Sequence, residues 1–173
     1  SITHYPFLSE KNMRMKQYWT SIWSLLAICF IGSVGVSIAA PLKIGVIGLT
    51  HAHVHWILGR PDRGDITIVG IVEPNRELAT RFLKQHELSM DLHFESAEAM
   101  LAEVKPDGVT AFNSIYEHLE VVKAFAPLGV HVLVEKPMAV SAAHAREMVM
   151  LARQHEIHLL TNYETTWYPS NHR

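Results

Sequence analysis

The sequence predicts an α/β fold built on a parallel sheet, and three observations support this prediction. Short runs rich in isoleucine, leucine and valine alternate with longer segments of helical spacing. The short runs are continuously apolar, as in strands that are buried on both faces of a parallel sheet. Glycines, prolines and helix-capping residues separate the two kinds of segment. With 49% hydrophobic residues, a chain of 173 residues can bury one such core.

Six strands are expected, each from a dense apolar run bounded by glycine, proline or polar residues. They span residues 42–48, 66–73, 92–94, 107–112, 130–135 and 157–163. The first, LKIGVIG, ends in the glycine of a turn, and the second, ITIVGIVE, ends in an acid. The third is only a short LHF run, whereas DGVTAF, VHVLVE and IHLLTNY are again dense in apolar residues.

Five helices are expected between these strands, from apolar residues three and four positions apart. They span residues 53–59, 75–87, 96–104, 116–129 and 141–156. Asn75 and Ser96 stand where N-cap side chains are needed at the second and third helices. Pro127 and Gly129 end the fourth helix. The order of elements fits a doubly wound, Rossmann-like sheet, in which ligands bind beyond the carboxyl ends of the strands.

A hydrophobic leader is expected before this domain. Arg14 and Lys16 precede an apolar run from residue 22 to 40, the order of a secretory signal peptide, with cleavage expected before Ala40. The run is also close to the ~20 residues that span a bilayer, so a membrane anchor is the alternative. The chain is thus divided into a leader (1–40, including upstream residues), the Rossmann-like domain (41–163) and the start of a linker (164–173). We expect an exported protein, touching a membrane only through an uncleaved leader.

Composition excludes some partners. The formal net charge is −2, from 15 basic and 17 acidic residues, and no basic run occurs, so nucleic acid is not expected. Cys29 is the single cysteine, which rules out an intrachain disulfide. The expected partner is a small molecule, and a homo-oligomer formed at the sheet edge stays open.

The loop after the first strand, GLTHAHVHW, allows three interpretations. In a dinucleotide fold its glycines make the turn, admit the pyrophosphate and let the helix pack closely. Gly48 fills the first position, but Thr50 and His53 stand at the other two. The free amides of the helix that follows would still attract an anion. His51, His53 and His55 could instead hold a metal. No second tight ligand cluster follows in the sequence, so we predict no metal site.

Two further strand ends carry candidate residues. Glu73 ends the second strand, where a carboxylate accepts hydrogen bonds from a ribose diol and repels a 2′-phosphate. The cofactor expected is therefore NAD or NADP, with NAD favoured. Lys136 follows the fifth strand, where its ammonium group could hold a substrate hydroxyl or carboxylate beside a nicotinamide.

The chain from about residue 42 to 168 resembles the Gfo/Idh/MocA family of nicotinamide-dependent sugar and polyol oxidoreductases. The resemblance rests on IGVIGL, GIVEPNRELATRF and KPDGVTAFNSIYEHLEVVKAF, followed by GVHVLVEKPMAVSAAHAREMVMLARQHEIHLLTNYE. It implies that Lys136 of the EKP motif is catalytic. It also implies a cofactor-binding set, which comprises Gly48, Thr50, His51, Glu73, Asn113, His118, Glu135 and Lys136. The sequence departs from the family at the later loop glycines, and Asn113 and Ser114 stand where a proline is often found.

The resemblance also implies a second domain that supplies the substrate pocket and a catalytic histidine. The sequence given covers the nucleotide-binding domain of such a protein, so we expect no efficient catalysis from this segment alone. Its expected function is to bind NAD(P) for an exported oxidoreductase acting on a sugar- or polyol-like substrate. The alternatives are a non-catalytic Rossmann-like binding domain and a metal-dependent hydrolase using His51, His53 and His55.

Overall fold

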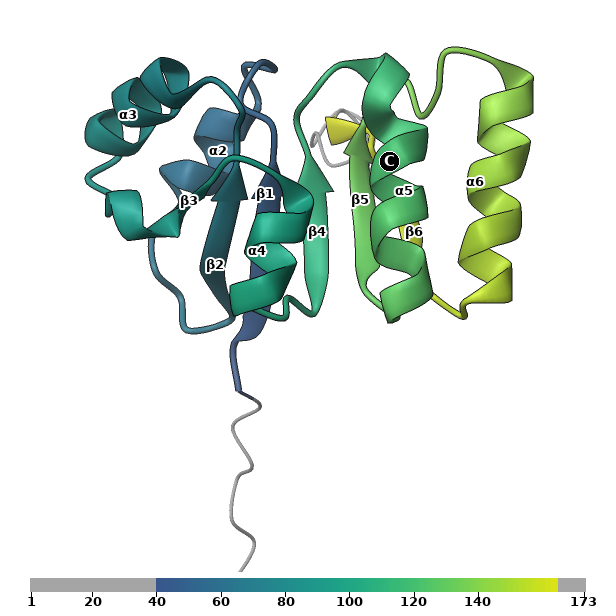
Figure 1. Ribbon diagram of the computed structural model, residues 1–173, viewed down its shortest axis with the longest axis horizontal. Coiled ribbons are helices and arrows are strands. Elements are labelled where there is room, and N and C mark those ends of the chain that lie inside the picture. The colour runs from purple at the N-terminus through teal and green to yellow at the C-terminus, as the bar shows by residue number, and fades with distance from the viewer. Residues whose placement is uncertain (1–39, 165–173) are drawn as a thin grey trace, which may run out of the picture. The chain divides into compact units, whose positions relative to one another are not determined.

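The computed structural model describes residues 40–164. These residues form a six-stranded, fully parallel sheet in the order β3-β2-β1-β4-β5-β6 (Figure 1). The strands are β1 (Leu42–Ile47), β2 (Ile66–Val72), β3 (His93–Phe94), β4 (Gly108–Ala111), β5 (His131–Glu135) and β6 (Leu159–Asn162). The predicted parallel sheet and all six strands are confirmed, with ends shifted by one or two residues. The predicted leader and linker lie outside the described residues, apart from their positions 40 and 164.

Five α-helices connect the strands. They are α2 (Val54–Leu58), α3 (Arg76–Gln85), α4 (Ala97–Glu103), α5 (His118–Phe125) and α6 (Ala142–Gln154). Short 3-10 turns precede β3 and flank α5 on both sides. The predicted caps are confirmed: the Asn75 side chain accepts hydrogen bonds from the amides of Glu77 and Leu78, and Ser96 accepts one from Ala99. No helix within residues 40–164 is long and apolar enough to cross a bilayer.

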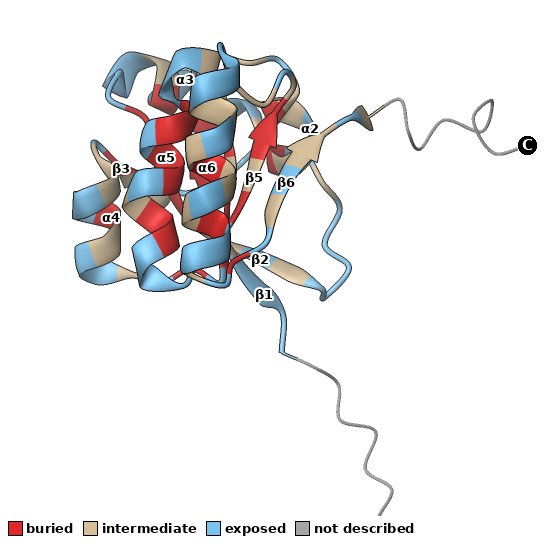
Figure 2. Cartoon of the chain, turned by 90° about the vertical axis from the view of Figure 1, so that its right-hand side faces the viewer, coloured by how far each residue is buried: buried red, intermediate tan, exposed pale blue. Residues whose placement is uncertain are grey.

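Successive residues of one strand pack into two separate hydrophobic cores, one on each face of the sheet. Val46 of β1 and Ile71 of β2 pack with α2 and α3 on one face. Their neighbours Ile47 and Val72 pack on the opposite face, in a core that includes residues of α4, α5 and α6. Figure 2 shows the buried stripe of α5 turned toward the sheet and its outer surface exposed. This alternation follows from the two-residue period of a strand, and it explains why the strands are apolar throughout.

The strand order places β1 between β2 and β4, at the centre of the sheet. The order reverses there, because the chain first runs from β1 toward β3 and then returns to β4 on the other side. In doubly wound folds this reversal is where ligands bind, beyond the carboxyl ends of the strands. Because all six strands are parallel, the segments that follow β1, β2, β4, β5 and β6 meet at one edge of the sheet.

Candidate functional site

The turn after β1 depends on Gly48. Its φ is +77°, in the left-handed region that favours glycine. A Cβ atom at this position would lie 2.5 Å from the Asn113 Cβ and 2.8 Å from the Asn113 backbone nitrogen. The first turn therefore packs directly on the loop that follows β4, at the reversal point of the sheet. Gly48 thus occupies the tight-turn position predicted for it.

Glu73 supports this turn through its carboxylate. One oxygen accepts a hydrogen bond from the Leu49 amide at 2.9 Å, and the other accepts one from the Asn75 amide at 2.9 Å. The residue is only 5% exposed. Each oxygen keeps a second lone pair, so a ribose hydroxyl could still donate to it. The structure thus adds a supporting role to the predicted ribose contact, because the same carboxylate joins the ends of β1 and β2.

Two further contacts fasten the first loop to the end of β4. The His51 amide donates to the Phe112 carbonyl at 2.9 Å, and the Thr50 hydroxyl donates to the same oxygen at 3.2 Å. Asn113 follows Phe112, and its buried Oδ1 has no hydrogen-bond partner within the described residues. Thr50, His51 and Asn113 were predicted as cofactor-binding residues, and the structure brings all three to the reversal point.

The helix after this loop is shorter than predicted. It comprises five residues, and the amides of Val54 and His55 already donate to the carbonyls of His51 and Ala52. The amide of His53 faces the Nδ1 atom of His51 at 3.3 Å. Local turn contacts thus use these three amides, and the anion site expected at the start of this helix stays a prediction.

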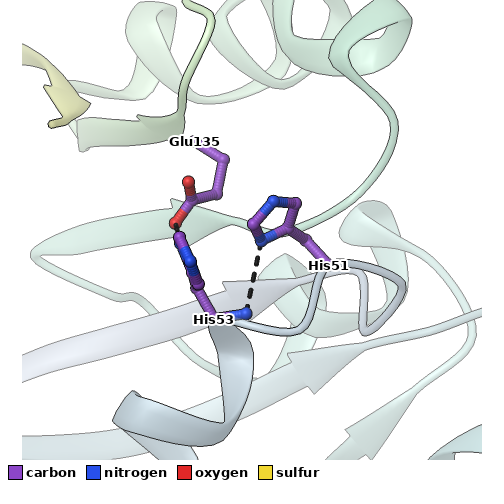
Figure 3. A group of neighbouring side chains, drawn as sticks. All are labelled: His51, His53 and Glu135. Atoms are coloured by element: carbon purple, nitrogen blue, oxygen red, sulfur yellow. Dashed lines mark hydrogen bonds and ion pairs between the residues drawn. The ribbon is translucent and has the colours of Figure 1, made fainter. Parts of the chain in front are cut away.

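His53 joins the first loop to the far half of the sheet. Its Nδ1 atom lies 3.0 Å from Oε1 of Glu135, at the end of β5 (Figure 3). Its Nε2 atom lies 3.0 Å from Oε2 of Glu164, just after β6. The ring stacks on Trp56, with centroids 4.0 Å apart. An imidazole at the third glycine position is thus held between two carboxylates and an indole.

Glu135 is almost completely buried, with 1% of its surface exposed. Besides His53, its carboxylate accepts hydrogen bonds from the Asn162 side chain at 2.6 Å and from the Lys136 amide at 3.2 Å. Lys136 itself is half-buried, and its ammonium group forms no ion pair within residues 40–164. The Lys136 side chain therefore has no anionic partner in the described part of the chain.

The three histidines of the first loop separate into two groups. His51 and His53 lie with Glu135 so that one ligand atom of each falls within 4.8 Å of the others (Figure 3). His55 instead contacts His86, with 2.7 Å between Nδ1 and Nε2. Burial lowers the pKa of His86, and the neighbouring His55 lowers it further. Glu135 is the additional ligand that the sequence could not assign to the cluster.

His118 begins α5 and is completely buried. Its Nδ1 atom lies 3.1 Å from the Met138 carbonyl, so Nδ1 carries a proton that it donates. Burial lowers the pKa of His118, although the Met138 carbonyl, Glu135 and Glu117 act in the opposite direction. A neutral ring with a proton on Nδ1 leaves a lone pair on Nε2, and this buried atom has no partner within the described residues.

Sequence reasoning missed three residues of this arrangement: Trp56, Asn162 and Glu164. The loop after the sixth strand was expected to face the ligand, which is the signal that could have identified Asn162 and Glu164. Trp56 carried no such signal, because an aromatic residue in a short helix is usually part of a core.

Comparison with known proteins adds to this geometry. A family model described as "Oxidoreductase family, NAD-binding Rossmann fold" matches residues 42–163. The oxidoreductase YceM of Salmonella typhimurium is 30% identical over 129 residues, which cover 74% of this chain and 40% of that protein. The 1,5-anhydro-D-fructose reductase of Ensifer adhaerens is 27% identical over 119 residues, which cover 69% of this chain and 35% of that protein. The chain therefore spans about two fifths, or less, of the length of these relatives.

A solved structure shares the fold. The UDP-N-acetylglucosamine 3-dehydrogenase GnnA from Acidithiobacillus ferrooxidans has a TM-score of 0.64 and 22% sequence identity. The similar region covers 78% of this chain and 42% of that one. At this identity the likeness concerns the fold alone.

Proposed function

The chain belongs to the Gfo/Idh/MocA oxidoreductase family, and on that premise we propose that it binds NAD for an oxidoreductase acting on a sugar- or polyol-like substrate. The observation that carries this proposal is the Gly48 turn, which packs on Asn113 where the strand order reverses. The name of the Ensifer relative, a reductase of a sugar derivative, supports the substrate class.

The residues at the reversal point fit a dinucleotide. Gly48 leaves no room for a side chain at the turn, as the family's loop requires. Asn113 offers a buried acceptor, Oδ1, that lacks a donor within the described residues. Ribose hydroxyls and the nicotinamide carboxamide are donors that could satisfy it. The exposed Thr50 side chain is the main departure, since its Cβ stands where a glycine usually admits the pyrophosphate.

When bound, the nicotinamide would accept or deliver a hydride. In this proposal Lys136 holds a substrate hydroxyl or carboxylate through its ammonium group, which forms no ion pair within residues 40–164. Glu135 fixes the start of the loop after β5, because its carboxylate accepts a hydrogen bond from the Lys136 amide. Glu73 keeps the Gly48 turn in place and disfavours a 2′-phosphate by its charge.

A fluorescence titration of the full chain with NADH tests the proposal. We expect saturable binding, and weaker binding of NADPH because of the Glu73 carboxylate. Lys136→Ala should also lower the affinity for NADH several-fold, because the family resemblance places Lys136 in the cofactor-binding set as well. A lost contact worth about 1 kcal/mol corresponds to a factor of about five in affinity. Lys105→Ala is the matched control, because Lys105 is exposed and precedes β4, at the opposite end of the strands.

A folded chain that shows no saturable binding of either nucleotide would contradict this function. That result would favour the second candidate, a Rossmann-like domain that binds another ligand. The observation behind the second candidate is the loop after β1, where the side chains of Thr50 and His53 stand in place of two glycines. His53 is also held there by Glu135.

We also propose that the protein is exported, on the basis of the charges and apolar run that precede Ala40. Expression with a C-terminal tag, followed by fractionation and mass spectrometry, should find a mature chain in the exported fraction that begins at Ala40. An Ala39→Arg variant should keep its leader, because cleavage requires a small residue there. A tagged protein that stays cytoplasmic with its leader intact would disprove export.

A further inference from the structure

We propose that His51, His53 and Glu135 bind a divalent transition-metal ion, with Zn²⁺ as the best match. Two of the ligands come from the loop after β1, and the third ends β5, 82 residues after His53. The fold therefore assembles the site, because Glu135 lies far from the two histidines in the sequence. The proposal concerns the ion alone and does not rest on the proposed function.

The geometry suits a single ion. One ligand atom from each residue lies within 4.8 Å of the other two, and His53 Nδ1 lies 3.0 Å from Glu135 Oε1. Ligands about 2.0–2.1 Å from a tetrahedral zinc lie about 3.3 Å from one another. Small side-chain rotations would therefore close the set around an ion. If His51 binds through Nδ1, it exchanges the hydrogen bond from the His53 amide, which is long at 3.3 Å.

The chemistry of the donors points to a transition metal. Two imidazoles and one carboxylate form the ligand set of many zinc enzymes, and a similar set binds non-haem iron. Such a set leaves at least one coordination position for water or another oxygen ligand. Calcium and magnesium prefer oxygen ligands throughout, so they match these residues less well.

The negative charge of the carboxylates around His53 also favours a bound cation. Glu135 is 1% exposed, and no lysine or arginine pairs with it within residues 40–164. Its other donors, the Asn162 amide group and the Lys136 backbone amide, are neutral. Glu164 places a second carboxylate against the opposite nitrogen of His53, and its buried Oε2 makes no geometrically acceptable hydrogen bond within residues 40–164. Burying a carboxylate that has no lysine or arginine beside it is costly, and a divalent ion would offset that cost.

His118 supplies an independent observation. It is completely buried, and its Nε2 lone pair has no partner within the described residues. It lies close enough to His51 and Glu135 for both to influence its pKa. A metal-bound water is a strong hydrogen-bond donor, the kind of group that this acceptor lacks. Without an ion, the His118 acceptor stays unsatisfied within the described residues.

Metal analysis of the full chain tests the proposal. After EDTA treatment and dialysis, calorimetric titration with Zn²⁺ should show one ion bound per chain, and Co²⁺ should give visible absorption bands of a low-symmetry site. Glu135→Gln and His51→Ala should each weaken Zn²⁺ binding by more than about 100-fold, because even outer-shell partners cost 10–100-fold. The matched control is His55→Ala, since His55 comes from the same loop but contacts His86. This control should keep the affinity of the unaltered chain.

Circular dichroism of each variant separates loss of the ion from loss of the fold. If Glu135→Gln does not fold, His51→Ala still decides, because that side chain is partly exposed and lies outside both cores. Two results would overturn the proposal: a folded, unaltered chain that binds neither Zn²⁺ nor Co²⁺, or zinc that His51→Ala retains with unchanged affinity. Because no nicotinamide is present in these titrations, a failure of NADH binding would not affect the result.

Discussion

Gly48→Ala is expected to lower the free energy of unfolding by about 2–5 kcal/mol and to abolish NADH binding. A left-handed conformation costs an L-residue about 1–2 kcal/mol. The added methyl group would also stand 2.5–2.8 Å from atoms of Asn113, two of which belong to the backbone. Overpacking of that kind costs about 1–3 kcal/mol more, and it pushes the loop after β4 away from the turn. Urea unfolding of both proteins measures the difference.

Gly64→Ala separates the cost of the left-handed conformation from the cost of overpacking. Gly64 has a similar positive φ of +71°, but no atom lies within 4 Å of its would-be Cβ. Only conformational strain applies, so a loss of about 1–2 kcal/mol is expected, with NADH binding kept. Equal losses in the two variants would show that the packing of Gly48 on Asn113 contributes nothing.

Glu73→Ala is expected to destabilise the domain by about 2–4 kcal/mol. The substitution leaves the Leu49 and Asn75 amides without their acceptor, and Leu49 is almost fully buried. An unsatisfied buried donor costs about 1–3 kcal/mol, and bonds to a charged acceptor are at the upper end. Thermal or urea unfolding measures this loss. Glu95→Ala is the control, since this exposed glutamate should change stability by no more than about 0.5 kcal/mol.

The same variant tells how Glu73 acts on the nucleotide. If the carboxylate only supports the turn, Glu73→Ala should weaken NADH and NADPH equally. If it also contacts the ribose diol, the variant should lose the preference for NADH over NADPH. A Glu73→Ala protein as stable as the unaltered chain would contradict the supporting role, whatever its affinity for nucleotides.

Local sequence signals predicted much of this fold. The Asn75 and Ser96 caps and the six apolar runs each depend on residues a few positions apart, and the structure confirms them. The α2 helix is shorter than the predicted residues 53–59, because the amides of its first residues, Val54 and His55, donate to carbonyls three residues earlier, as in a turn.

The sequence predicted less of the candidate site, because the contacts of the site join segments that lie far apart in the chain. Glu73 was identified by its place at a strand end, but its bond to the Leu49 amide crosses 24 residues. The contact between His53 and Glu135 crosses 82 residues, and only the folded sheet brings the two together. For the same reason, the sequence could not show that His51 and His53 share a cluster while His55 belongs elsewhere.

The central place of β1 has a consequence for the order of events during synthesis. β1 is made first, yet one of its two neighbours, β4, includes residues 108–111. The Lys43 amide donates to the carboxylate of Asp107, 64 residues later in the chain. At about 5–20 residues per second, that partner leaves the ribosome roughly 3–13 s after β1. One edge of β1 must therefore wait unpaired, and the half-sheet of β1, β2 and β3 is the largest part of the sheet that can assemble in the interval.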